Sequence, residues 1–286
     1  MAYKKTKHIV YPLRLRSDFN TFKLNNNLRV RRMSLADKER FLKIKNPIYD
    51  ADENLKSWQP LEGCLIDIKL LSGEYFGVSM EFCSSNYMLI AANADIARAF
   101  NFAIKIISDS KSGIYMGFRN GDRFFFYPPT YYGSEGPLRV EKTTTTKVKK
   151  LINQIESAHK DNTLLTIIDM FHLATSPSLR DESRFIELTI ILEMLLLPSQ
   201  SQELRYRFSL RMAKLLNKLY KGPLEATYEK AQDIYDIRSR LVHSGKHRKC
   251  KAMLPIAFEY TRLLVSAYLE NKDMFTDDNL NKLCLL

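Results

Sequence analysis

The pattern of apolar and polar positions changes near residue 145. Before that point, short apolar runs alternate with turn residues: residues 64–70 and 75–82 flank Ser72-Gly73-Glu74, and residues 22–24 and 28–32 flank three asparagines. Residues 114–118 and 123–127 flank Asn120-Gly121, where both residues can take the positive φ of a tight hairpin turn. Apolar positions recur at helical spacing over residues 94–108. These patterns predict an α+β domain over residues 1–145.

Beyond about residue 147 the strand signals nearly vanish and the pattern is helical. Apolar positions at helical spacing predict helices over about residues 148–174, 181–197, 201–220, 224–243 and 250–271, with a short turn of helix at 277–286. Their separators are helix breakers or caps, namely Ser176-Pro177, Pro198-Ser199, Gly222-Pro223 and Ser244-Gly245. The sequence therefore predicts an all-α bundle over residues 146–286, after the α+β domain.

Composition narrows the class of protein. The chain has 286 residues, of which 45% are hydrophobic, so it can bury a sizeable core. Its longest strongly apolar stretch, residues 188–197, contains Glu193 and falls short of the roughly 20 residues that span a bilayer. The first sixteen residues lack the apolar core of a signal peptide. Four cysteines show no paired spacing that suits zinc. We expect a cytoplasmic chain without a membrane segment, metal or cofactor.

The formal net charge is +12, and it is unevenly distributed. Residues 1–45 contain 13 Lys/Arg against 3 Asp/Glu, and residues 147–286 contain 22 against 17. An excess of this size favours a polyanionic partner, because contacts with phosphate dominate the affinity for nucleic acids. Charge that only keeps the chain in solution would produce the same count. Charge alone thus leaves RNA or DNA binding open.

The stretch YDIRSRLVHSGKH, residues 235–247, contains the strongest candidate chemistry. Arg238 and His243 are five residues apart, so on an ideal helix their side chains diverge by about 140°. Gly245 can adopt the positive φ at which helices end, and the negative end of the helix dipole would favour a protonated His243. The basic residues Lys246, His247, Arg248 and Lys249 follow. The stretch could hold phosphate, or it could be an ordinary basic helix end.

Three segments together carry a family resemblance. RFIELTIILEMLLL at 184–197, ELRYRFSLRMA at 203–213 and IYDIRSRLVHSG at 234–245 resemble the Apea-like HEPN family in order, helix type and spacing. HEPN domains are helical bundles marked by an R-x4-6-H motif on the fourth helix. The resemblance covers about residues 147–271, and Arg238 and His243 match the motif. At Ser239 the chain departs from the Asn, Asp or His that many members carry.

The resemblance implies a metal-independent endoribonuclease that acts as a homodimer on an RNA substrate. Motif helices of two protomers would face each other, so that residues that diverge on one helix converge across a two-fold axis. The ribose 2′-OH would attack the adjacent phosphate, leaving a 2′,3′-cyclic phosphate and a 5′-OH. His243 would act as general base or acid, and Arg238 would stabilise the phosphate charge. A bacterial antiphage defence or toxin role follows from the resemblance, with a phage or host trigger or a regulatory protein as a further partner.

Several residues are candidates for supporting roles. Glu193 is a lone carboxylate in an apolar helix, which is costly unless it is paired, and Arg211 or Arg238 could be its partner. Asp236 and Tyr235 could orient the motif, or they could have ordinary packing and surface roles, and Ser239, next to Arg238, is a further supporting candidate. The four residues Lys246, His247, Arg248 and Lys249 are candidates for RNA binding. The alternative function is a catalytically inactive HEPN module that binds nucleic acid or supports assembly. In that case the chain would have the HEPN fold without ribonuclease activity.

Overall fold

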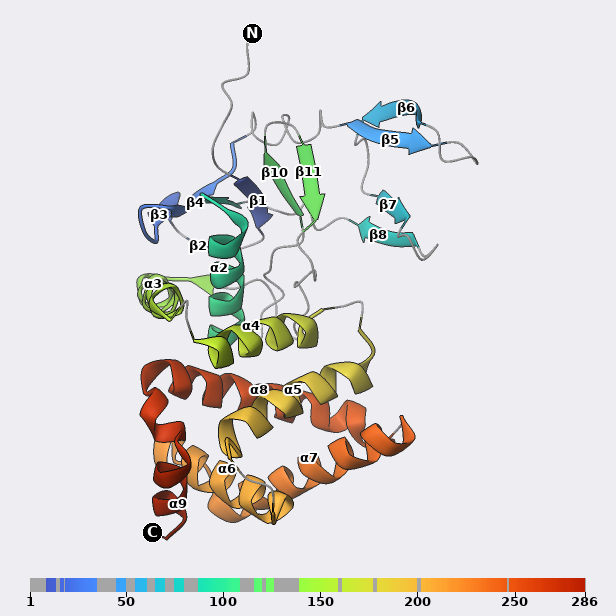
Figure 1. Ribbon diagram of the computed structural model, residues 1–286. Coiled ribbons are helices and arrows are strands. Elements are labelled where there is room, and N and C mark those ends of the chain that lie inside the picture. Colours follow the sequence, from blue (N-terminus) through green and yellow to red (C-terminus); the bar gives the residue numbers. More distant parts are fainter. Residues whose placement is uncertain are drawn as a thin grey trace.

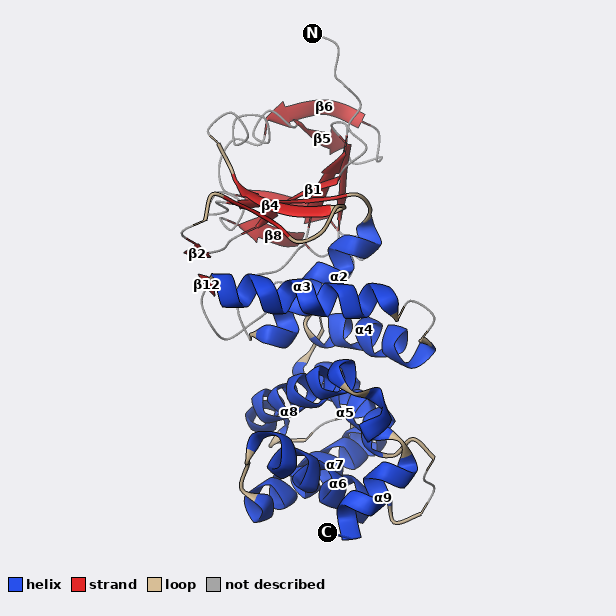
Figure 2. Cartoon of the chain, turned by 90° about the vertical axis from the view of Figure 1, so that its left-hand side faces the viewer, coloured by secondary structure: helices blue, strands red, loops and turns tan. Residues whose placement is uncertain are grey.

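The protein has a strand-rich N-terminal portion followed by stacked helices (Figure 1). The computed structural model describes residues 9–13, 16–17, 19–34, 45–49, 55–60, 65–69, 75–79, 87–108, 116–119, 122–125, 139–158, 161–176, 179–199, 202–245 and 247–285. In a perpendicular view the strands lie at one end, α2, α3 and α4 lie in the middle, and the remaining helices form the other end (Figure 2). The α+β portion and the helical portion predicted from sequence are both present.

One antiparallel sheet dominates the strand-rich portion. Its six strands lie in the order β11-β10-β1-β9-β4-β3, and every neighbouring pair is antiparallel. Its strands are β1 (Ile9–Leu13), β3 (Thr21–Lys23), β4 (Leu28–Arg32), β9 (Tyr87–Ala91), β10 (Met116–Arg119) and β11 (Asp122–Phe125). Three two-stranded pairs accompany it: β2 (Arg16–Ser17) with β12 (Arg139–Val140), β5 (Lys45–Tyr49) with β6 (Leu55–Pro60), and β7 (Leu65–Lys69) with β8 (Tyr75–Ser79).

The predicted hairpins are confirmed, but the sequence patterns missed a central strand. The pairs β3–β4, β7–β8 and β10–β11 are the three hairpins expected from the turn residues. β9 was not predicted. It lies between β1 and β4, and so it connects the half of the sheet that contains the β10–β11 hairpin with the half that contains the β3–β4 hairpin. Its Leu89, Ile90 and Ala91 are all buried, and so short an apolar run does not by itself distinguish a strand from a piece of helix.

Eight α-helices and one 3-10 turn are described. They are α2 (Ala94–Ile107), α3 (Lys142–Ser157), α4 (Asn162–Ala174), α5 (Asp181–Leu196), α6 (Leu204–Tyr220), α7 (Leu224–Ser244), α8 (Cys250–Glu270), η1 (Lys272–Phe275) and α9 (Asp277–Leu285). The single helix expected over 148–174 is wrong. The Asp161 carboxylate accepts a hydrogen bond from the backbone N–H of Leu164 and starts α4 as a new helix.

Helix α5 is the centre of the helical portion. Phe185, Leu188, Ile191 and Leu192 are fully buried, because α5 packs against α4, α6, α7 and α8 together. α6 and α7 form a helical hairpin, whose connection begins at Lys221 in a left-handed conformation with φ of 57°. A helix that is apolar on nearly all sides suits this enclosed position. Glu193 therefore lies on a helix that packs against four others.

The two portions share one continuous core. Buried residues run from Leu24 and Val30 of the sheet side, through Phe100 of α2, to Leu280 of α9. The Arg262 guanidinium on α8 donates hydrogen bonds to the backbone carbonyls of Ile106 and Ile107 at the end of α2, at 3.2 and 2.9 Å. The boundary predicted near residue 145 falls within the first turn of α3, which packs against α2. Within the described part of the chain, no helix is long and apolar enough to cross a membrane.

Candidate functional site

Helix α7 carries the candidate motif and ends where the sequence predicted. Gly245 has a φ of 71°, and its backbone N–H donates to the Leu241 carbonyl at 2.8 Å, which closes the helix. This left-handed stop is the conformation that glycine adopts at little cost. His243 therefore lies in the last turn of α7, next to backbone carbonyls that have no helical partner.

The inward face of α7 determines where the motif residues point. Ala231, Ile234, Ile237 and Leu241 are buried and pack the helix onto the bundle. Arg238 lies at the edge of this stripe and keeps 30% of its side chain exposed, whereas His243 is exposed. No hydrogen bond or ion pair joins Arg238 to His243 in the described residues, and the unbroken helix preserves their divergence of about 140°.

Arg238 forms an ion pair with Glu193 on α5. Its Nη2 lies 3.0 Å from Glu193 Oε2, and the Glu193 side chain is only 21% exposed. Of the two arginines considered as partners for this carboxylate, Arg238 is therefore the one that pairs with it. The Arg238 Nε is buried and has no hydrogen-bond partner among the described residues. The guanidinium thus retains donor capacity beyond its contact with Glu193.

Burial raises the pKa of the Glu193 carboxyl, and the positive charge and hydrogen bond of Arg238 oppose the rise. The pKa of the neighbouring Tyr235 phenol is also raised, first by burial and then by the Glu193 charge. Tyr235 packs its ring against Phe208 of α6 with a centroid distance of 5.5 Å. Glu193, Tyr235 and Arg238 thus form a half-buried polar cluster at the α5–α7 contact, in which the Arg238 charge favours the ionised form of the carboxylate.

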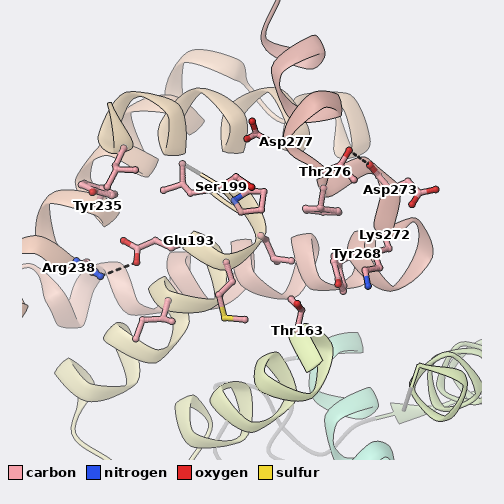
Figure 3. A pocket seen from close by; sticks show the side chains of 17 residues that line it. Thr163, Glu193, Ser199, Tyr235, Arg238, Tyr268, Lys272, Asp273, Thr276 and Asp277 are labelled. Carbon is pink, nitrogen blue, oxygen red and sulfur yellow. Dashed lines mark hydrogen bonds and ion pairs between the residues drawn. The ribbon is translucent and has the colours of Figure 1, made fainter. Parts of the chain in front are cut away.

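This cluster lines a cleft of about 810 Å³ (Figure 3). In the view shown, Arg238 and Glu193 lie at one side of the cleft and Lys272 and Tyr268 at the other. Lys272 Nζ lies 2.8 Å from Asp161 Oδ2. Burial works to raise the pKa of Asp161, but hydrogen bonds from Lys272, the Leu164 N–H and Tyr268 outweigh it and lower the pKa. The sequence patterns did not single out this second ion pair.

Arg211 lies in a different interaction network. It is 1% exposed, and its guanidinium donates to the Leu196 carbonyl at 2.7 Å and to Asp277 and Asn281 at 2.8 and 2.6 Å. These bonds tie the end of α5 to α9. None of these hydrogen bonds reaches Glu193 or Arg238. Arg211 therefore anchors α9 to the bundle and does not contact the motif residues.

The residues beside Arg238 differ in their surroundings. Asp236 accepts two hydrogen bonds from Arg205 of α6, at 2.7 and 2.8 Å, and so joins α6 to α7. Ser239 is half-buried on the outward side of α7. Val242 is 55% exposed, and on a helical wheel it lies between Arg238 and His243. The outward face of α7 therefore carries an exposed apolar side chain between the two motif residues.

The basic loop after α7 lies close to the motif helix. Arg248 and Lys249 are exposed, and His247 is half-buried with its Nε2 3.4 Å from Arg240 Nη1. Lys246 lies outside the described residues. Within the described segments, no three His, Cys, Asp or Glu side chains gather as metal ligands would. Comparisons with protein-family models, curated proteins and solved structures give no match for this chain.

Proposed function

We propose that the chain is a HEPN-type endoribonuclease whose motif residues, Arg238 and His243, act in a homodimer. The observation that carries the proposal is the arrangement on α7: a half-buried arginine aligned by Glu193, and an exposed histidine in the last turn before a glycine stop. A cation aligned before substrate binds stabilises developing phosphate charge without later reorganisation. The resemblance of the three helical segments supports the same assignment.

The proposed reaction is intramolecular transfer at phosphorus and needs no metal. The 2′-oxygen loses its proton to a base, a bond forms between the 2′-oxygen and phosphorus, and the bond from phosphorus to the 5′-oxygen breaks. The leaving 5′-oxygen takes up a proton, so the products are a 2′,3′-cyclic phosphate and a 5′-OH. His243 serves as base or acid, since an imidazole exchanges protons near neutral pH. Arg238 donates to the non-bridging phosphate oxygens.

Dimerisation through the outward face of α7 would resolve the divergence of the motif residues. A two-fold axis along this face brings the Arg238 and His243 of one protomer near those of its partner. The same contact would cover the exposed apolar side chain of Val242. Val242→Asp should therefore disrupt the dimer and abolish cleavage. Leu165→Asp, at a 43% exposed position on α4, is the matched control and should change neither.

The decisive experiment compares RNA ends. Wild type, Arg238→Ala and His243→Ala are expressed in parallel, and cellular 5′-OH ends are sequenced. Among wild type and these two variants, we expect only wild type to enrich such ends. Purified Arg238→Ala and His243→Ala should each cleave RNA at least about a hundredfold more slowly than wild type, with unchanged helical circular dichroism. Arg98→Ala, which breaks the 2.6 Å pair with Asp169 away from α7, is the arginine control. Equal cleavage by all four proteins would reject the proposal.

An inactive nucleic-acid-binding or assembly module is the second candidate, because Ser239 replaces the more polar residue of many HEPN ribonucleases. It predicts salt-dependent RNA binding without new 5′-OH ends. The proposed biological setting is bacterial antiphage defence or toxicity in the cytoplasm, and its basis is the family resemblance. A phage or host trigger would then control the activity, so cleavage is to be measured both in infected and in uninfected cells.

A further inference from the structure

A second cavity, of about 500 Å³, lies between the loop after α7 and the start of α5. Leu179, Arg180, Asp181, Glu182, His247, Arg248, Cys250 and Lys251 line it. Asp181 is neutralised by Arg184, whose Nη1 lies 3.3 Å from its carboxylate. Arg180, Arg248 and Lys251 are exposed and form no ion pair with any described residue. Three uncompensated cations therefore surround a hollow with one uncompensated carboxylate, Glu182.

Arg240 lies next to His247, which lines the cavity. His247 Nε2 lies 3.4 Å from Arg240 Nη1, and the donor and acceptor roles in this contact depend on the tautomer of the ring. The backbone N–H of Lys249 donates to His247 Nδ1 at 3.3 Å. Because a guanidinium has five N–H donors, Arg240 could also donate to an anionic oxygen placed beside His247.

The backbone around the cavity adds to the positive potential. The cavity meets the N-terminal ends of α5 and α8, which contact each other through a hydrogen bond from the Cys250 thiol to the Asp181 carbonyl at 3.7 Å. Neither helix has a side-chain cap at its first turn. The positive ends of the two helix dipoles favour an anion in this space, whereas Asp181 and Glu182 in the first turn of α5 oppose it.

The cavity is also close to the motif along the chain. Arg240 lies three residues before His243, which corresponds to about 4.5 Å along the helix axis and about 60° around it. Arg240 and His243 thus lie on one side of the last turns of α7, and His247 follows across the glycine stop. A strand whose phosphate is held at Arg240 and His247 would pass directly beside His243.

We propose that this cavity, lined by Arg180, His247, Arg248 and Lys251 and with Arg240 next to His247, is a phosphate subsite that holds the backbone of the RNA strand next to the scissile bond. This inference rests on the proposed function. Arginine suits the task because its planar guanidinium binds phosphate oxygens in pairs. The subsite positions the strand through its backbone and carries no base specificity of its own.

The test measures RNA binding by fluorescence anisotropy with a labelled, unstructured oligoribonucleotide. The parent protein carries His243→Ala, and Arg180→Ala with Lys251→Ala is added to it. We expect at least a tenfold increase in Kd, and a slope of log K against log salt that is shallower by about 0.7 for each phosphate that the protein no longer neutralises. Adding Lys218→Ala with Lys282→Ala, two exposed lysines on α6 and α9, removes the same charge away from the cavity and should leave the slope unchanged.

Each outcome decides the inference. Equal weakening by the cavity variants and the distant lysine variants would overturn it, because the weaker binding would then reflect net charge alone. An unchanged salt slope in the cavity variants, or a parent protein that does not bind RNA, would overturn it as well. Arg180→Lys should restore part of the binding, since it restores the charge without the planar fork. The proposed ribonuclease function is judged separately, by the 5′-OH ends that wild type produces.

Discussion

Buried His172 on α4 should make the folded protein sensitive to acid. Its ring lies against Phe102 of α2 with a centroid distance of 6.2 Å. The pKa of His172 is lowered from 6.5 to about 3, chiefly by burial and also by the charges of Arg98 and Lys105, against a backbone hydrogen bond to Arg98 that works to raise it. The folded protein therefore keeps this imidazole neutral at pH values where the unfolded chain protonates it.

The size of the effect follows from proton linkage. Because the folded pKa is lower than the unfolded one, the free energy of unfolding is highest above pH 6.5 and falls as the pH drops toward 3. Between pH 8 and pH 5 the decrease from this one group is about 2 kcal/mol. With an unfolding entropy of about 2.1 cal/mol/K per residue, the melting temperature would fall by about 3 °C.

Urea unfolding followed by circular dichroism at 222 nm tests this reasoning. His172→Gln removes the titrating group and keeps polar atoms at the site, so its unfolding free energy should fall by about 2 kcal/mol less than that of wild type between pH 8 and pH 5. His247→Gln, in the loop after α7, is the control and should follow wild type. An identical decrease in the unfolding free energy of wild type and His172→Gln would refute the argument. Other titrating groups, such as Glu193, are present in both proteins, so their contributions cancel in the comparison.

Three further predictions follow from individual contacts. Arg211→Met should lower the free energy of unfolding by about 3 kcal/mol in urea titrations, because it leaves the Leu196 carbonyl and Asp277 without their buried donor; a decrease below about 1 kcal/mol would contradict the anchoring role. Gly245→Ala should cost about 1 kcal/mol by thermal unfolding, since its φ is 71° and the added Cβ meets no atom within 4 Å; an unchanged melting temperature would argue against the left-handed stop. Cys250 should react with a thiol reagent at pH 8 far more slowly in the native than in the unfolded protein, because burial raises its pKa to about 11; equal rates would contradict its burial.

Local signals in the sequence predict most of the helical portion. The breakers at Pro198, Gly222 and Gly245 separate α5, α6, α7 and α8 within three residues of their observed ends. The split between α3 and α4 was missed, although its signal is present. Asp161 is a favourable N-cap residue, but apolar positions continue at helical spacing on both sides of it. A polar cap inside a continuous apolar pattern is easily taken for an exposed helix position.

The sequence narrowed the partner of Glu193 to Arg211 or Arg238 but could not choose between them. Glu193 offers one carboxylate and the following helices offer several arginines; only the packing of α5 against α7 brings Arg238 to it across 45 residues. The Arg211 pair spans 66 residues and depends on where α9 docks. Helical periodicity assigns residues to faces of one helix, whereas pairing depends on how helices cross. The cavity at Arg180 could not be predicted for the same reason, because its lining comes from two distant segments.

Helix α8 mechanically links the two ends of the protein. Near the middle of α8, Arg262 donates hydrogen bonds to the last carbonyls of α2. The first turn of α8 borders the cavity at Arg180. The thirteen residues from Cys250 to Arg262 span about 18 Å along the helix axis, and Pro255 lies among them. Helix α8 thus connects the end of α2 in one portion with the cavity at Arg180 in the other.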